Sequence, residues 1–214
     1  MKNSYIKLLF STLAATTLFS CHDLDVPVTT ALTTDVFPST AEQFISASGP
    51  VYVALRGNFG AEAFQIASYS TDEGIMPARG GNWYDGGQNQ TLHLHTWTVD
   101  NGYVNGHWTW LSTIIGVSNQ SISILEQKMP EGAAKQTTLS EIKVVRAFAY
   151  FMMMDAFGNV PIYTTYGDFA PKTNSPRTEV FNFVEKEILE AIPNLSDVSG
   201  ITQYGRPNKW TAYA

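Results

Sequence analysis

The chain of 214 residues holds 19 acidic and 13 basic side chains, which gives a net charge of −6 at pH 7. This acidic balance, without any run of Lys or Arg, argues against nucleic acid as a partner, because duplex binding depends on basic side chains that neutralise phosphates. Aromatic residues reach 13% and charged residues only 15%, a balance that excludes a disordered chain and predicts a packed hydrophobic core.

Residues 1–20 predict a bacterial secretory signal peptide. Lys2 and Lys7 supply a short positive region, and the uncharged, mostly apolar stretch Leu8–Phe19 follows. That stretch has the length of a signal-peptide core and is too short to span a bilayer, which needs about 20 apolar residues. A buried N-terminal helix is the alternative interpretation. Removal of residues 1–20 would leave 11 basic and 19 acidic side chains, a net charge of −8.

The sequence Leu18-Phe19-Ser20-Cys21 resembles the lipobox that the bacterial lipoprotein signal peptidase cuts. Cys21 is the only cysteine, so an exported chain has no disulfide to form, and lipidation gives this thiol a use. The alternative is an ordinary secretory signal with an incidental cysteine. Several acyl chains on Cys21 would anchor the protein stably to a membrane. Residues 21–38, with their prolines and acidic start, are predicted to form a solvated, lipidated tether.

Five helical segments and one short helix are predicted between residues 39 and 214. Apolar residues recur every three or four positions in the long segments, the period of an amphipathic helix. Capping residues mark several ends, such as Ser39-Thr40 before the first segment and Gly158 after the third. The last helix has no stop signal before Ala214, so we expect the polypeptide to be the N-terminal part of a longer protein. The predicted helices are 39–56, a short one over 61–68, 100–128, 140–157, 178–192 and one that begins at Asn208.

Residues 70–98 are predicted to be a long loop, because they are rich in glycine and show no helical period, with a short strand over 92–97. Paired glycines flank the stretch Asn82-Trp83-Tyr84-Asp85, and Arg79 precedes it. Flat aromatic rings suit the apolar faces of sugars, and amide, carboxylate and guanidinium groups suit their hydroxyl rim. The loop therefore predicts a glycan-binding site. The alternatives are that Trp83 packs inward against the helices, or that a partner protein contacts the loop. The candidate ligand-binding residues are Arg79, Asn82, Trp83, Tyr84 and Asp85.

Two other kinds of site are weaker interpretations of the same region. His93 and His95 would share a face on a strand and, with His107, could bind a metal, but no second thiolate or helical histidine pair supports this. Asp72 and Glu73 could act as a glycosidase pair, but neighbours in an extended segment point opposite ways and would not flank one bond. We therefore predict no catalytic residue, no metal site and no cofactor.

Several side chains on the predicted helices are assigned to the core or to the surface. Trp97, Trp108 and Trp110 lie in or beside periodic segments and are predicted to be buried. The methionines at 152–154 are predicted to fill the core. Charged side chains three to five residues apart on one helix favour a surface ion-pair set. This set consists of Glu141, Lys143 and Arg146.

Three patches carry a family resemblance. Glu141, Lys143, Arg146, Ala147 and Tyr150 lie on one helix that leads into Phe157-Gly158-Asn159-Val160-Pro161, and Gly205-Arg206-Pro207-Asn208-Lys209 opens the last helix. In this order and spacing, and together with the lipobox and Thr71-Asp72-Glu73, they resemble the motifs of the SusD/RagB family of outer-membrane lipoproteins.

The resemblance implies a mostly α-helical fold with tetratricopeptide-like helix pairs and a long irregular loop region, of which residues 39–214 would be the N-terminal part. It also implies a cell-surface lipoprotein that binds glycans or other nutrients and delivers them to a SusC-like TonB-dependent transporter, without catalysis or cofactor. In such proteins the loop after Thr-Asp-Glu can carry aromatic ligand contacts, which favours Trp83 and Tyr84. A surface polysaccharide hydrolase and a protein-binding scaffold are the alternatives.

Overall fold

The structure is a computed structural model of the chain, and it describes residues 36–57, 62–197 and 204–214. The chain divides into two compact units, residues 1–37 and 38–214, and the fold described below is that of the second unit. The predicted signal peptide, Cys21 and most of the predicted tether lie outside the described residues. Within these described ranges, no helix is both long and apolar enough to cross a membrane.

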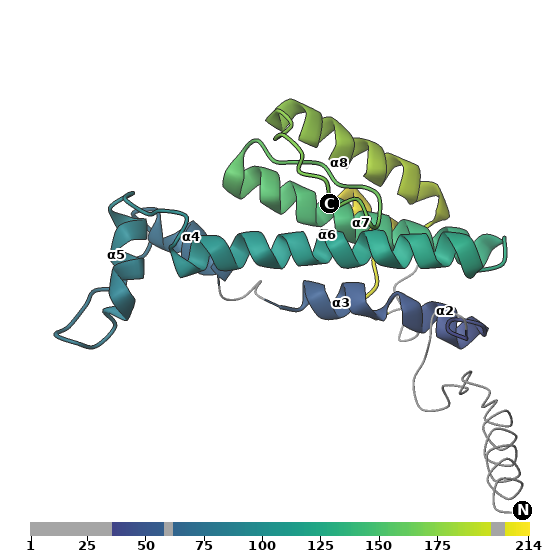
Figure 1. Cartoon of the computed structure of the whole chain (residues 1–214), viewed down its shortest axis with the longest axis horizontal. Coiled ribbons are helices and arrows are strands. Elements are labelled where there is room, and N and C mark those ends of the chain that lie inside the picture. The colour runs from purple at the N-terminus through teal and green to yellow at the C-terminus, as the bar shows by residue number, and fades with distance from the viewer. Residues whose placement is uncertain (1–35, 58–61, 198–203) are drawn as a thin grey trace, which may run out of the picture. The chain divides into compact units, whose positions relative to one another are not determined.

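Helix α6, with 27 residues, is the axis around which the other helices of this unit are arranged (Figure 1). Helices α7 and α8 lie on one side of α6, α2 and α3 lie on the other, and α4 and α5 gather at the end where α6 begins. The predicted mostly helical fold class is confirmed. The elements are α2 (Ala41–Ala47), α3 (Gly49–Leu55), α4 (Glu62–Tyr69), η2 (Asp85–Gly87), α5 (Gln88–His93), α6 (Gly102–Lys128), α7 (Ala133–Phe157), α8 (Arg177–Ala191), η3 (Ile192–Asn194) and α9 (Lys209–Tyr213).

The core lies where α6 and α7 pack against each other and against α3 and α8. Its fully enclosed side chains recur at helical spacing, as the sequence pattern predicted. Burial of one such aliphatic side chain stabilises the fold by about 1.5–3 kcal/mol, so these positions hold the helices together. They include Val51 of α3, Leu111, Ile114 and Leu125 of α6, Ile142 and Tyr150 of α7, and Val180 of α8.

The three tryptophans predicted to be buried differ in their surroundings. Trp110 is buried, and its indole N–H donates to the carbonyl oxygen of Ala54 at 2.8 Å, which ties α6 to α3. Trp108 is only half-buried and lines a groove, and Trp97 is 43% exposed, so the prediction is wrong for Trp97. Trp97 follows the end of α5, in a segment that belongs to no helix. Of the methionines at 152–154, the last two are buried, as predicted.

The predicted single helix over 39–56 is instead two helices. Its N-cap is confirmed, since the hydroxyl of Thr40 accepts a hydrogen bond from the backbone N–H of Gln43 at 3.3 Å. Helix α2 then ends, and α3 begins beyond Ser48 with Pro50 in its first turn. Proline has no N–H to donate and its ring clashes with the preceding turn, so a continuous helix is broken here.

Helix α7 starts at Ala133 and not at Ser140, which lies buried within it. Its first turn is fixed by Lys135, whose ammonium group donates to the carbonyl oxygen of Glu126 at 2.9 Å and pairs with Glu131 at 2.6 Å. The residues before Ser140 include two threonines, which are weak helix formers, but tertiary packing overrides this preference. The end of α7 is confirmed, because Gly158 terminates it with a φ of 73°.

The predicted surface ion-pair set on α7 is wrong for two of its three members. Glu141 and Arg146 are only 5% and 4% exposed. Arg146 pairs with Glu187 of α8, and Glu141 pairs with Arg206. Buried charges persist only when they are paired, and here the partners come from segments far along the chain. Lys143 is partly exposed, with its ammonium nitrogen 3.8 Å from the Glu190 carboxylate.

Helix α8 lies at its predicted position, but two of its large apolar side chains lie outside its buried face. The side chains of Phe181 and Leu189 are 52% and 60% exposed. The buried side has helical spacing but includes Glu187. The carboxylate of Glu187 can be buried because it pairs with the guanidinium of Arg146 on α7. The buried residues of α8 are Val180, Val184, Glu187 and Ala191.

The segment 70–98 is not a loop throughout, because η2 and α5 occupy residues 85–93. The predicted strand over 92–97 is wrong, since His93 ends a helix and His95 lies in a turn with a φ of 56°. Because there is no strand here, side chains do not alternate between two faces, and nothing places His93 and His95 on one face. In the part of the chain that the structure describes, no three His, Cys, Asp or Glu side chains are grouped as metal ligands.

Residue His107 should give the fold a pH dependence. Its ring is 2% exposed and packs against Trp110 and Phe157, with ring centroids 5.6 and 5.9 Å away. Burial lowers the pKa of His107 below its usual value near 6.5, and the Glu62 carboxylate partly opposes this effect. The unfolded chain then binds the proton more readily than the folded one. We therefore expect full stability above about pH 6.5 and a loss below it, by at most about 1.4 kcal/mol per pH unit.

Urea denaturation between pH 8 and pH 5 tests this prediction. In a His107→Gln variant the loss that begins below about pH 6.5 should be smaller than in the unchanged protein. Parallel profiles for the unchanged protein and the His107→Gln variant would contradict the prediction.

Candidate functional site

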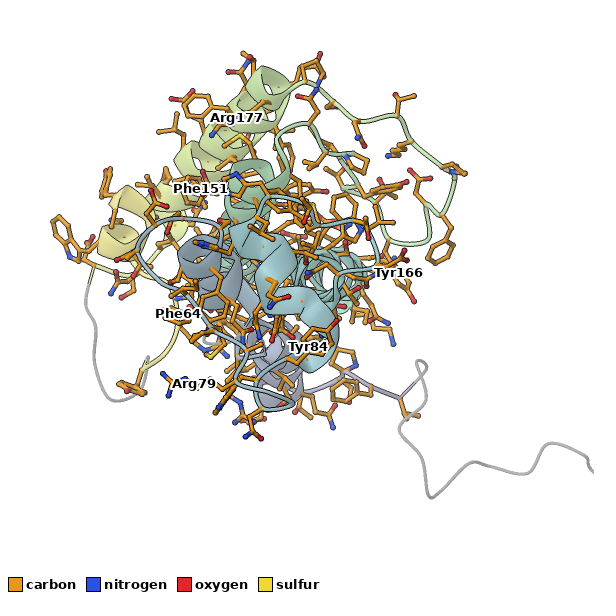
Figure 2. The ribbon with its side chains drawn as sticks, turned by 90° about the vertical axis from the view of Figure 1, so that its left-hand side faces the viewer. Phe64, Arg79, Tyr84, Phe151, Tyr166 and Arg177 are labelled. Carbon is orange, nitrogen blue, oxygen red and sulfur yellow. The ribbon has the colours of Figure 1, made fainter. Side chains whose placement is uncertain are left out.

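The predicted ligand-binding residues lie in one short segment, here called the 79–85 loop, at the end where α6 begins. Arg79 and Asn82 close a tight turn with two reciprocal backbone hydrogen bonds, of 3.0 and 3.1 Å. Gly80 takes a φ of 60° in this turn, a conformation that glycine adopts without steric cost. Figure 2 looks at this end of α6 and shows Arg79 and Tyr84 on the side of the molecule opposite Arg177.

Two aromatic side chains of the loop project into solvent. Trp83 is 66% exposed and Tyr84 is 51% exposed, so the alternative that Trp83 packs inward is wrong. The backbone of Trp83 has a φ of 62° and that of Asp85 a φ of 44°. Such values are rare for bulky residues and cost about 1–3 kcal/mol each, and they cluster at ligand-binding sites where the surrounding structure enforces them. The loop thus presents an exposed indole on a constrained backbone.

A hydrogen-bond network through Asp85 enforces this backbone. The carboxylate oxygen Oδ2 of Asp85 accepts hydrogen bonds from the hydroxyl of Tyr103 at 2.9 Å and from the amide of Gln88 at 3.3 Å. Burial, and then the hydrogen bond to Asp85, raise the pKa of Tyr103 to about 12, so its phenol stays a donor at neutral pH. The side chain of Gln88 also accepts from the backbone N–H of Gly102 at 2.6 Å, which ties the loop to α6.

Asn101 joins α5 to α6 with both ends of its amide. Its oxygen caps α6 by accepting from the backbone N–H groups of Tyr103 and Val104, at 3.0 and 3.3 Å. Its NH₂ group donates to the carbonyl oxygen of Gln88 and to the hydroxyl of Thr91, at 3.1 and 3.0 Å. Helix α6 therefore begins close to its predicted start, and the side chain that caps it also holds the helix that follows the 79–85 loop.

Replacing Asn101 with alanine should lower the free energy of unfolding by about 2 kcal/mol, because it removes a cap and leaves buried groups unpaired. Urea denaturation monitored by circular dichroism measures this loss. Thr40→Ala is the matched control, since Thr40 is exposed and its side-chain oxygen caps only α2. Its loss should be nearer the lower limit of about 0.5 kcal/mol. Equal losses in both variants would show that the link to α5 contributes nothing.

A cavity of about 380 Å³ opens beside the loop. Two of the five predicted residues, Trp83 and Asp85, line it, while Arg79, Asn82 and Tyr84 do not. The amide oxygen of Asn89 is buried and has no hydrogen-bond partner. The sequence pointed to none of the other lining residues, because they come from three helices and the segment after α4, which only the fold brings together. These are Gln65 and Tyr69 of α4, Met76, Asn89 of α5 and Tyr103 of α6.

A groove of about 650 Å³ lies between α6 and residues 161–169, away from the 79–85 loop. Its aromatic side chains are Trp108, Tyr150, Tyr163, Tyr166 and Phe169. The segment that forms its outer wall is held by Asn119, whose amide donates to the carbonyl oxygen of Tyr163 at 2.9 Å. The hydroxyl of Tyr150 accepts a hydrogen bond from the backbone N–H of Tyr163 at 2.7 Å and donates one to the carbonyl oxygen of Tyr163 at 3.0 Å. The sequence analysis did not identify this groove.

The residues weighed as a glycosidase pair, Asp72 and Glu73, lie exposed in the turn after α4. That turn is ordered by Thr71, whose hydroxyl donates to the carbonyl oxygen of Ser68 at 2.9 Å and accepts from the N–H of Glu73 at 3.2 Å. Neither carboxylate lines the cavity beside the 79–85 loop. The two carboxylates thus share no cavity with the exposed aromatic rings.

Solved structures that share this fold include SusD-like proteins and a surface glycan-binding protein. A laminarin-binding SusD-like protein matches 81% of this chain with a TM-score of 0.69 and 22% identity, over 38% of its own length. A SusD-like protein from Bacteroides fragilis matches 84% with a TM-score of 0.70 and 17% identity, over 34% of its length. The surface glycan-binding protein A from Bacteroides uniformis matches 81% with a TM-score of 0.68 and 20% identity, over 40% of its length. The fold is therefore SusD-like, with tetratricopeptide-like helices.

The sequence comparisons identify the family. The profile of the SusD-like family described as "starch-binding associating with outer membrane" matches residues 60–214, and the chain belongs to this family. A SusD-like protein of Bacteroides ovatus is 22% identical over 220 residues, which cover 91% of this chain and 38% of that protein. SusD-like protein P38 of Formosa agariphila is 27% identical over 188 residues, which cover 85% of this chain and 36% of that protein. The chain thus spans less than two fifths of the length of either relative.

Proposed function

We propose that this protein binds glycans at the 79–85 loop and delivers them to a SusC-like TonB-dependent transporter, without catalysing a reaction. The observation that carries the proposal is the pair of exposed rings, Trp83 and Tyr84, with Trp83 on a constrained backbone beside a cavity with polar walls. Aromatic side chains with exposed faces stack on the apolar faces of sugars, and a fixed backbone reduces the entropy that binding costs.

The names of related proteins support a carbohydrate ligand. One protein of the same fold binds laminarin, and another was solved with a xylogluco-oligosaccharide. The second of these matches 79% of this chain with a TM-score of 0.61. Because the chain spans a minor part of its relatives, the ligand and the transporter partner are proposals for the whole protein.

Attachment to the outer membrane is the second part of the proposal. The family description mentions association with the outer membrane, and the resemblance of residues 18–21 to a lipobox supports a lipid anchor at Cys21. A lipid on Cys21 and the tether over 21–38 would hold the binding unit at the cell exterior, where polymeric nutrients arrive. Palmitate labelling of the chain in a bacterial host, with Cys21→Ser as the control, should give a labelled band only when Cys21 is present.

The test of glycan binding uses the chain from Asp23 onward on native gels that contain single polysaccharides. Retardation by one class of glycan, without release of reducing sugar in the same samples, is the expected result. Release of reducing ends would favour the alternative of a surface hydrolase. Absence of retardation by every glycan, with the fold intact by circular dichroism, would favour the alternative of a protein-binding scaffold.

A further inference from the structure

The cavity beside the 79–85 loop offers acceptors to a ligand and no positive charge. Among the residues that the structure describes, its lining includes one carboxylate, that of Asp85, and no Lys or Arg. The hydrogen bonds from Tyr103 and Gln88 fix this carboxylate in place. A ligand group that enters the cavity therefore meets the negative charge of a carboxylate whose position is fixed.

The second acceptor is the amide oxygen of Asn89. Asn89 lines the same cavity, is 5% exposed, and its Oδ1 atom is enclosed without a hydrogen-bond partner. A buried acceptor that is left unpaired costs free energy, which a donor supplied by a ligand would recover. A sugar hydroxyl can donate such a bond, whereas a carboxylate or sulfate group only accepts.

The surrounding segment strengthens this preference for donors. Residues 62–105 hold five acidic side chains and one basic side chain, Arg79, so the segment carries a charge of −4. Arg79 is exposed and lies outside the lining of the cavity. A local negative field raises the free energy of a bound anion and lowers its association rate. The acidic residues are Glu62, Asp72, Glu73, Asp85 and Asp100.

We infer that the site selects uncharged glycans and rejects uronic-acid and sulfated ones, with the Asp85 carboxylate and the Asn89 amide oxygen as acceptors for sugar hydroxyls. The inference rests on the proposed function, because it specifies the ligand class of the same site. It assigns a binding role to Asn89 and a positioning role to Tyr103, and both lie outside the stretch that the sequence singled out.

The experiment compares pairs of polymers with one backbone and substituents of similar size. Hydroxyethyl and carboxymethyl derivatives of starch, of laminarin and of cellulose, at equal substitution, are titrated into the chain at low and at high NaCl. For the backbone that binds, the carboxymethyl form should bind about tenfold more weakly at low salt, as like charges a few ångströms apart imply. The difference should shrink at high salt, because salt screens exposed charges.

Single-residue variants test whether the preference for the uncharged derivative arises in the cavity. Asp85→Asn, which keeps an acceptor for Tyr103, should reduce the ratio between the two derivatives. Glu73→Gln removes an equal charge from the same segment but outside the cavity, and should reduce the ratio much less than Asp85→Asn does. Asn89→Ala should weaken binding of the hydroxyethyl form about two- to tenfold, the range for one lost hydrogen bond.

Equal or tighter binding of the carboxymethyl forms, or of polygalacturonate, would overturn the inference and leave glycan binding in place. Loss of that binding in Arg79→Gln would then identify Arg79 as the anion-binding group. Absence of binding to every uncharged and anionic polymer would instead overturn the proposed function, and the inference with it.

Discussion

Replacement of Arg146 with alanine should lower the free energy of unfolding by about 3–5 kcal/mol, the largest change that we expect from a single substitution here. The guanidinium of Arg146 bonds both carboxylate oxygens of Glu187, at 2.8 and 2.6 Å. It also donates to the amide oxygen of Asn119 at 2.6 Å and to the carbonyl oxygen of Thr164 at 3.3 Å. Its loss would leave the carboxylate of Glu187, 6% exposed, as an uncompensated buried charge.

This network joins three parts of the fold, since Arg146 lies on α7, Glu187 on α8 and Asn119 on α6. The same Asn119 holds the segment that walls the aromatic groove. We therefore expect Arg146→Ala to loosen α8 and the groove together, and native-state hydrogen exchange should show faster exchange in both.

Urea denaturation measures the loss, and two controls isolate its cause. The double variant Arg146→Met with Glu187→Leu should recover most of the stability, because apolar side chains of similar size carry no desolvation cost. The pair Arg177 and Asp155 is exposed, with a nitrogen–oxygen distance of 3.7 Å, so Arg177→Ala should cost less than about 1 kcal/mol. An equally small loss for Arg146→Ala would show that the buried pair does not hold the helices together.

The second large effect is expected in ligand binding. Trp83→Ala should weaken the binding of a retained glycan about 30-fold, which corresponds to roughly 2 kcal/mol, the contribution of a well-placed aromatic contact. Stability should change by less than about 0.5 kcal/mol, because the indole is 66% exposed. Isothermal titration calorimetry and urea denaturation of the same preparation separate the two quantities.

The chain offers a matched control in Trp210. Its side chain is 67% exposed, nearly the same as that of Trp83, but it belongs to α9 and lines no part of the cavity beside the 79–85 loop. Trp210→Ala should leave glycan binding unchanged. If both variants bind as the unchanged protein does, the ligand is held elsewhere, and the aromatic groove along α6 becomes the next surface to test.

Local sequence signals determined where most helices lie. Asn101 and Asn208 cap the helices that follow them, and Gly158 ends α7, because these residues satisfy backbone groups within a few positions of their own. The motifs of the SusD/RagB family could also be identified from the sequence, since they are short runs of residues at fixed spacing. The exposure of the Trp83 and Tyr84 side chains also followed from local composition, because the glycines on both sides leave these rings few neighbours to pack against.

Only the tertiary structure decided which charges are buried and which side chains line the cavity. Glu141 and Arg206 are 65 residues apart, and Arg146 and Glu187 are 41 apart, so no helical period relates the partners. Asn89 and Tyr103 reach one cavity because Asn101 fastens α5 to α6. The physical reason is common to these cases. Helix ends are set by hydrogen bonds within one turn, whereas burial depends on which surfaces meet when helices pack.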